Sequence, residues 1–396
     1  MSTNLLVISA PNRFGWLTSG TPLERATRFL AVLTGFSIPL STSFSEITTG
    51  LFMACWVCSG NWRAKWAVIR ANTVALWSLA LFGVLLVGVT WSVESWASAG
   101  RCLLKYREFV YVPMFLVVFR DAALRRIAVS AFMLAAVILL GLSYYEWLTG
   151  ADFGISSNPR DYVIAKDHII HSLIMAFVVY LAAGRVAENL GRVSPESRGA
   201  WGWVALYAAI IAVTVYNELC MLTGRTGYVV LAALVCLFLA ERMGRRGLVI
   251  ATVLLAVSAW AAVNFSMLIR ARVDQTISQL QNQLGPERKH SPDPRMEFYA
   301  NTLEMIARHP WLGTGTGSFR REYARHVADK DDVATSDPHN EYLHLASQVG
   351  IPGAVLFMSL LAFQWFAAAR LPATERSIGR GVVATIALGS LFNSLI

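Results

Sequence analysis

The chain has 396 residues, of which 55% are hydrophobic and only 15% charged, and its mean hydropathy is +0.49. A soluble domain carries about 25% charged residues, so the composition excludes an ordinary soluble protein and indicates an integral membrane protein. The net charge of +9 would suggest a nucleic-acid partner in a soluble chain. Here the placement of Lys and Arg along the chain accounts for that charge, and no nucleic-acid partner is expected.

Apolar windows of about 20 residues, the length that crosses a bilayer, recur along the chain. Nine predicted spans form a transmembrane region over residues 1–270, and two more follow within residues 351–396. The last window is still apolar at Ile396, so the natural protein is expected to continue, into a twelfth span. The predicted spans lie near residues 24–42, 43–60, 72–91, 106–120, 124–148, 163–184, 200–219, 226–242, 247–270, 351–370 and 378–396. An amphipathic interfacial helix is expected just ahead of the fourth span, over residues 96–110.

The orientation follows from the loops between the spans. With the N-terminus in the cytoplasm, the inside segments hold 18 Lys and Arg and the short outside loops hold six. Lys and Arg gather in cytoplasmic loops, so this orientation is favoured. The long loop after the ninth span then lies outside the cytoplasm, in the periplasm of a Gram-negative cell.

That loop, residues 271–350, is the only long polar stretch and forms the predicted middle domain. Counting Arg270 at its edge, it holds ten Lys and Arg, eleven Asp and Glu, and five of the seven histidines. Helical spacing of apolar residues predicts a helix over residues 295–309. A second helix is expected to start at residues 337–338, with a capping Asp and a Pro at its first position. Both helices are expected to lie on the bilayer surface and to cover a cavity.

Three alternating glycines, Gly313, Gly315 and Gly317, separate the two expected helices. Glycines at this spacing can turn backbone N–H groups toward an anion, as in phosphate-binding nests. The alternative is a flexible hinge. The spacing alone favours the hinge.

His339 falls in the first turn of the second expected helix. A helix N-terminus disfavours imidazolium, which would leave a neutral imidazole able to accept a proton near neutral pH. The alternative is a structural histidine. His168 and His171 are three residues apart beside Asp167, but the sequence offers no cysteine or further histidine near them, so no metal site is expected.

Arginines are the other candidate functional group. Arg225 ends a tight outside turn at the rim of a span, where an ionised side chain needs a partner or a wet cavity. Arg295 begins the first loop helix, and Arg288, Arg160 and Lys166 are placed to reach the same outer cavity. Guanidinium binds phosphate bidentately and stays charged in an apolar setting. Ordinary ion pairing and snorkelling toward the interface are the alternative.

Four stretches together resemble one known family. They are LTGRTGY at residues 222–228, PRMEFYANTLEMIARHPWLGTGTGSF at 294–319, DPHNEYLHLASQVGIPG at 337–353 and LFNSLI at 391–396. Their order and spacing resemble the signatures of the bacterial O-antigen ligase and O-antigen polymerase superfamily. The resemblance covers roughly residues 160–396, and the joint pattern is far more specific than any one motif.

The resemblance implies an all-α membrane glycosyltransferase of the C type, with about 11–12 transmembrane helices and one large periplasmic helical loop. Such enzymes act at the periplasmic face of the bacterial inner membrane and take a glycan from undecaprenyl pyrophosphate. The ligases transfer it to a hydroxyl of the lipid A–core oligosaccharide. By motif, His339 is the implied general base, and Arg225, Arg295 and Arg288 are the implied pyrophosphate ligands. Neither a metal nor another cofactor is implied.

Other functions stay open at this stage. An O-antigen polymerase or a protein O-oligosaccharyltransferase would use the same lipid-linked donor with a different acceptor. A lipid-glycan transporter would place paired charges midway through several spans, whereas most charges here lie at span ends or outside. The single dominant loop near the C-terminus and the P-H-N-E-Y-L run favour the ligase.

Overall fold

A computed structural model describes residues 20–151, 153, 161–192, 198–222, 224–265, 270, 277–278, 294–330 and 332–395. Within these residues the regular structure is entirely helical, which confirms the predicted all-α class. Six helical segments are long and apolar enough to cross a membrane, so the protein is a multi-pass membrane protein. They are Thr73–Trp91, Ala122–Thr149, His168–Leu190, Gly199–Met221, Thr226–Met243 and Glu341–Ala368. Arg160 and Arg288 lie outside the described residues.

The N-terminal half forms one group of closely packed helices. Its elements are α2 (Pro22–Leu40), α3 (Thr42–Cys58), α4 (Trp62–Arg70), α5 (Thr73–Gly88), the short η1 (Val89–Trp91), α6 (Trp96–Lys105), α7 (Glu108–Val118) and α8 (Ala122–Thr149). Thr21 and Glu24 form a reciprocal capping box at the start of α2. Only Ser41 separates α2 from α3, and the two helices form a hairpin in which the hydroxyls of Ser37 and Thr48 bond at 2.9 Å.

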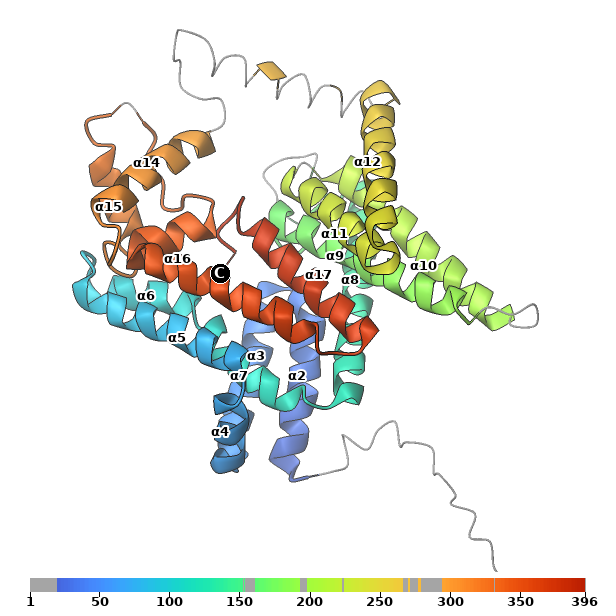
Figure 1. Ribbon diagram of the computed structural model, residues 1–396, viewed down its shortest axis with the longest axis horizontal. Coiled ribbons are helices and arrows are strands. Elements are labelled where there is room, and N and C mark those ends of the chain that lie inside the picture. Colours follow the sequence, from blue (N-terminus) through green and yellow to red (C-terminus); the bar gives the residue numbers. More distant parts are fainter. Residues whose placement is uncertain are drawn as a thin grey trace, which may run out of the picture.

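A second group follows in the chain and lies apart from α5 and α6 (Figure 1). It consists of α9 (His168–Leu190), α10 (Arg198–Tyr216), the π-helical turn η2 (Asn217–Met221), α11 (Thr226–Met243) and α12 (Arg245–Phe265). The most buried of these helices is α9, whose Met175, Ala176 and Val178 are fully enclosed. It packs between α10 and α11 and so forms the centre of this group.

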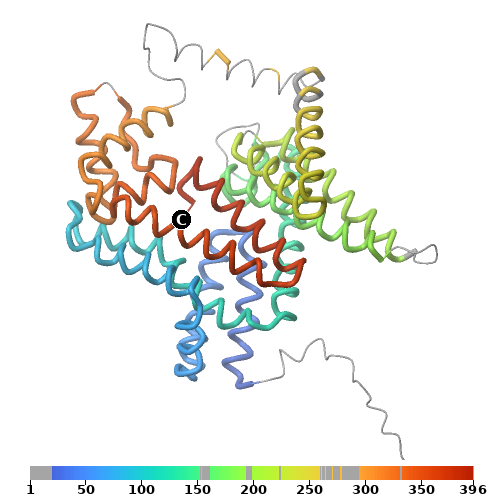
Figure 2. Tube along the Cα trace, in the orientation of Figure 1, coloured from blue at the N-terminus to red at the C-terminus, as the bar shows by residue number. Residues whose placement is uncertain are grey.

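The remaining helices join the two groups. They are α14 (Pro294–Arg308), α15 (Phe319–His326), α16 (Glu341–Ala368) and α17 (Ala373–Gly389). Helix α16 packs along α5, where Leu345 and Phe357 meet Leu81 and Leu85 in one core, and α17 packs against α9 and α11. The path from α16 into α17 therefore runs between the two groups, as the tube in Figure 2 shows.

Each of the eleven predicted spans overlaps a helix, and six of these helices are long and apolar enough to cross a membrane. Residues 96–105 of the expected interfacial stretch form the helix α6. Arginines from the loops predicted to face the cytoplasm tie helices together at one end of the molecule. Arg125 reaches Glu375 at 2.7 Å, and Arg380 reaches Glu241 at 3.1 Å. The opposite, outer end carries the starts of α9, α11 and α16, together with α14 and α15.

Candidate functional site

The glycine loop at residues 313–317 is a rigid, packed connection. Its three glycines have φ values of +63°, +96° and +82°, which an L side chain rarely adopts. The N–H groups of Thr314 and Gly315 donate to the carbonyls of Ser347 and Gln348, at 2.9 and 2.8 Å. The N–H of Thr316 donates to the carbonyl of Gly88 at 3.0 Å, and the N–H of Gly317 donates to Oε1 of Gln348 at 2.6 Å. The expected flexible hinge is therefore wrong, and the alternative anion nest is excluded because these donors are already bonded.

A kink in α16 supplies the acceptors for this loop. The backbone leaves helical geometry at Val349 and at Gly350, where φ is +76°. Pro352 lacks an N–H, so the carbonyl of Gln348 has no helical donor and accepts from Gly315 instead. The N–H of Ile351 turns to the carbonyl of Pro310 at 2.8 Å. The sequence QVGIPG thus makes the opening that the glycine loop fills.

Gln348 connects three parts of the outer end. It is fully buried, and its Nε2 donates to the Tyr106 hydroxyl at 2.9 Å, while Oε1 accepts from Gly317 N–H. Cys102 Sγ lies 3.6 Å from the same oxygen. A buried amide with both ends bonded stabilises a unique arrangement, so Gln348 fixes α6 and the glycine loop against α16.

His339 does not lie within a helix, contrary to the prediction. Its φ is +55°, and α16 begins only at Glu341, with Asn340 as the cap that accepts from Leu343 N–H at 3.1 Å. The carboxylate of Asp337 accepts from the His339 N–H at 2.7 Å, which forms a local turn instead of a helix cap. The helix-dipole argument for a neutral imidazole therefore does not apply to this residue.

The His339 ring is held by groups from α14 and from the C-terminal segment. It stacks on Phe298 with ring centroids 6.1 Å apart, and its Nδ1 lies 3.4 Å from Asn393 Oδ1. Tyr299 donates to the His339 carbonyl at 3.1 Å. Ser394 donates to the Asp337 carboxylate at 2.6 Å. The segment after α17 therefore completes the surroundings of His339, and the ring stays partly exposed.

Arg295 lies in the first turn of α14, close to His339 in the fold. Phe298 and Tyr299, which contact His339, follow it within the next turn of the same helix. Its side chain is partly exposed. The structure therefore brings Arg295 and His339 to one region, as the motifs implied.

Arg225 precedes α11 at the same end of the molecule, and its side chain is exposed. The turn that carries it rests on α9, since a Cβ at Gly224 would lie 3.2 Å from His168 Cδ2. The C-terminal segment, which follows α17, contacts both the core beneath the Arg225 turn and the His339 region. Its Leu395 packs with the core shared by α9 and α11, whereas its Asn393 contacts His339.

Beneath the Arg225 turn lies a buried polar cluster that the sequence only hinted at. His171 and Glu218 have no exposed surface, and neither side chain has a hydrogen-bond partner among the described residues. Asn217 beside them donates to Ser143 at 2.9 Å. Glu218 also lies against Gly227, where a Cβ would overlap its carboxyl group. A carboxylic acid in an apolar stretch marks a functional region, and this was the signal that the sequence offered. The π-helical turn is also typical of functional regions, but only the structure shows it.

No cluster of three His, Cys, Asp or Glu with metal-binding geometry occurs among the described residues. His168 and His171 therefore belong to no such three-residue group in this part of the chain.

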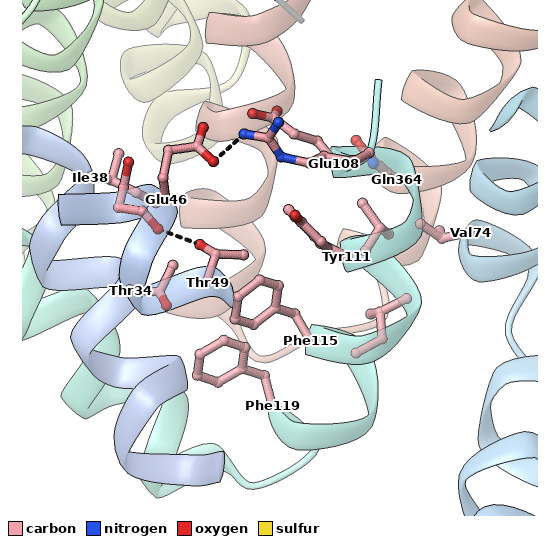
Figure 3. Close-up of a pocket in the computed structure, with 14 residues that line it drawn as sticks. Thr34, Ile38, Glu46, Thr49, Val74, Glu108, Tyr111, Phe115, Phe119 and Gln364 are labelled. Atoms are coloured by element: carbon pink, nitrogen blue, oxygen red, sulfur yellow. Dashed lines mark hydrogen bonds and ion pairs between the residues drawn. The ribbon is translucent and has the colours of Figure 1, made fainter. Parts of the chain in front are cut away.

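A separate apolar cavity of about 490 Å³ lies among α2, α3, α5 and α7. Tyr111, Phe115 and Phe119 line it at successive turns of α7, and an ion pair between Arg107 and Glu46 lies near its edge (Figure 3). Its lining does not include His339, Arg295 or Arg225. Its aromatic walls suit a hydrocarbon chain and not a pyrophosphate, so it is distinct from the candidate reaction site.

The fold defines the class of the protein: it is a multi-pass membrane protein, with His339, Arg295 and Arg225 at one end of its helix bundle. A family model described as O-antigen ligase matches residues 209–358, which include Arg225, Arg295, the glycine loop and His339. This match supports membership of the O-antigen ligase and polymerase superfamily. No curated protein gives a significant match to it.

Proposed function

We propose that the protein is an O-antigen ligase of the bacterial inner membrane. It would transfer a glycan from undecaprenyl pyrophosphate to a hydroxyl of the lipid A–core oligosaccharide at the periplasmic face. The setting of His339 is the observation that carries the proposal. A partly exposed imidazole is oriented by Asn393 and Phe298 at the outer end of the bundle, within the stretch that the family model covers.

In the proposed reaction, Nδ1–H of His339 donates to Asn393 Oδ1, so the lone pair is on Nε2. Nε2 accepts the proton of the acceptor hydroxyl while that oxygen attacks the anomeric carbon of the donor sugar. The bond from this carbon to the pyrophosphate oxygen breaks, and undecaprenyl pyrophosphate leaves with the electron pair. General base catalysis of this kind contributes about 10²–10⁴-fold to the rate.

Arginines would stabilise the charge on the leaving pyrophosphate. Arg295 is proposed for this role because α14 holds it beside His339, and Arg225 because it lies exposed at the same end. Arg288 is proposed on its motif position. Guanidinium groups aimed at charge that develops in the transition state act strongly where water is excluded. The donor sugar is already activated, so this mechanism requires positioning and charge stabilisation and no metal step.

The main alternatives differ in acceptor only. A polymerase would extend a second lipid-linked glycan, and a protein O-oligosaccharyltransferase would glycosylate a protein hydroxyl. A transporter would need ionisable groups midway through its spans. His171 lies in the first turn of α9 and Glu218 just past the end of α10, so both are near the outer end. This placement argues against transport.

Reconstitution of the purified full chain with undecaprenyl-pyrophosphate glycan and lipid A–core tests the proposal. Glycan on lipid A–core is expected, and His339→Ala should reduce the transfer rate by about 10²–10⁴-fold. His309→Ala, an exposed histidine of the same region, is the matched control and should transfer at the wild-type rate. Lengthened lipid-linked glycan would assign the polymerase instead. Full activity of His339→Ala would overturn its role as the base.

A further inference from the structure

A second site lies at the outer end, between α6 and α15. It is a cleft of about 750 Å³, here called the basic cleft. Its walls carry four cations and a single carboxylate, and His344 of α16 also lines it. These residues are Glu94, Arg101, Lys105, Arg320, Arg321 and His344. Neither Arg225 nor Arg295 lines this cleft, so it is separate from the arginines proposed to bind pyrophosphate.

The cations of the basic cleft are not neutralised by the surrounding structure. Arg101, Lys105 and Arg320 have no ion pair among the described residues, and Arg321 only donates to the Val93 carbonyl at 2.7 Å. By contrast, Arg325 at the other end of α15 reaches Glu322 at 2.6 Å.

Helix stability does not explain the two arginines of α15. Arg320 and Arg321 occupy its first turn, where the helix dipole disfavours cations. Their charge is therefore available to an external anion.

The floor of the basic cleft is preformed. A Cβ at Gly317 would lie 3.1 Å from both Ala99 Cα and Cys102 Cβ, so the glycine loop rests directly on α6. Phe319 is only 2% exposed, and its ring meets His344 edge-on at 5.3 Å between centroids. The backbone that positions Arg320 is thus rigid, and binding would require little reorganisation.

Large apolar side chains are exposed on α6, which contributes to the basic cleft, and just before the glycine loop. Trp96 and Leu104 of α6 are 71% and 59% exposed, and Trp311 and Leu312 before the glycine loop are 75% and 64% exposed. The indole of Trp91, at the end of η1, donates to the Leu312 carbonyl at 3.1 Å and so holds the segment before the glycine loop against η1. Tryptophans concentrate where a membrane meets water. We therefore expect the cleft to lie at the depth of lipid headgroups.

We propose that the basic cleft binds phosphate groups on the headgroup of a glycolipid held in the same leaflet. The ligand class follows from paired guanidinium and ammonium groups, which bind phosphate with charge-assisted hydrogen bonds. Its identification as the glycan acceptor rests on the proposed function. Since α16 carries His344 into the cleft and begins beside His339, a phosphate bound here would hold the acceptor sugar close to the proposed base.

Binding to the purified full chain in detergent tests this assignment without relying on catalysis. The probes are phosphorylated lipid A–core, the same glycolipid after enzymatic removal of its phosphates, and phosphatidylglycerol. The double variant Lys105→Gln/Arg320→Gln should bind the phosphorylated probe about tenfold or more weakly, since two charge-assisted contacts are lost. Arg308→Gln, an exposed arginine of α14 outside the cleft, is the control and should bind as wild type does.

The dephosphorylated glycolipid should bind to wild type as weakly as the phosphorylated glycolipid binds to the double variant. With the dephosphorylated probe, wild type and the double variant should therefore have the same affinity. Equal wild-type affinity for the two glycolipids would overturn the proposal. So would competition by phosphatidylglycerol or free inorganic phosphate at the concentrations of the phosphorylated probe, because the site would then be a general anion site.

A transfer assay separates this inference from the proposed function. The double variant should raise the KM for the acceptor about tenfold, with the donor KM and kcat nearly unchanged, because it weakens ground-state binding alone. If wild type binds the phosphorylated probe selectively but forms no glycosidic bond, the ligase assignment fails while the basic cleft is supported. Transfer by the double variant with an unchanged acceptor KM would overturn the acceptor assignment.

Discussion

Two regions at the outer end bury polar side chains in opposite ways. At the junction of α5, α6 and α16, Gln348 is fully buried and bonded at both ends of its amide. Beneath the Arg225 turn, His171 and Glu218 are equally buried, but neither has a hydrogen-bond partner among the described residues. A satisfied buried amide stabilises one geometry, whereas an unsatisfied buried acid destabilises the fold. Gln348 therefore has a structural role, whereas His171 and Glu218 are candidates for a functional one.

The largest expected effect comes from breaking the first region at its closest backbone contact. A Cβ at Gly315 would overlap the Ser92 backbone, and the φ of +96° is itself strained for alanine. We expect Gly315→Ala to lower the thermal midpoint in detergent strongly or to prevent folding. Gly141→Ala, where a Cβ meets nothing within 4 Å, is the matched control and should melt like wild type. An equal effect of the two changes would refute the tight contact.

Gln348→Leu tests the same region through its hydrogen bonds. The change leaves the Gly317 N–H and the Tyr106 hydroxyl buried without Gln348. Each unsatisfied group costs about 1–3 kcal/mol, so the variant should lose about 2–6 kcal/mol of stability. Denaturant titration in mixed micelles measures the loss. Gln364→Leu, which faces the apolar cavity, should change stability little or raise it. A neutral Gln348→Leu would show that the amide is dispensable.

Glu218→Gln distinguishes the second region from the first. Glutamine has the same shape and no charge, and the carboxyl has no hydrogen bond to lose among the described residues. We expect the thermal midpoint to stay the same or rise by a few degrees, in contrast to Gln348→Leu. If the glutamate serves function, glycan transfer should fall while the fold is retained. A loss of stability as large as that of Gln348→Leu would contradict the comparison.

The smallest effect is expected at the surface of α14. Hydrogen bonds from Lys330 and then His326 hold the pKa of Glu304 below its ordinary 4.5. A lowered pKa in the folded state stabilises the protein above pH 4.5, and the contribution disappears as the pH falls through the lowered value. Glu304 is more than half exposed, so the contribution is small. Thermal midpoints between pH 3 and 6 should show a shallower acid loss for Glu304→Gln than for wild type. Identical profiles would exclude the effect.

The positions of the spans could be predicted because a helix that crosses a bilayer needs about 20 consecutive, mostly apolar residues. Each of the six helices long enough to cross a membrane contains an apolar window, and the capping residues of α2 and α9 are adjacent to the helices they cap. The start of α16 was predicted three residues too early. Asp337 and Asn340 are both suitable caps, and only the long-range contacts of Asp337 with Ser394 and of Asn340 with Leu391 select between them.

The sequence by itself determined the membrane class and the choice of His339, Arg225 and Arg295 as candidates, since composition and motif spacing are properties of short stretches. The orientation of the loops stays a prediction from the distribution of Lys and Arg. The tertiary structure decided what those stretches meet. It showed that the glycine loop closes a kink in α16, that Asn393 orients His339, and that Lys105 and Arg320 share one cleft. These partners are distant in the chain. Their meeting depends on how whole helices pack, which no local pattern of residues encodes.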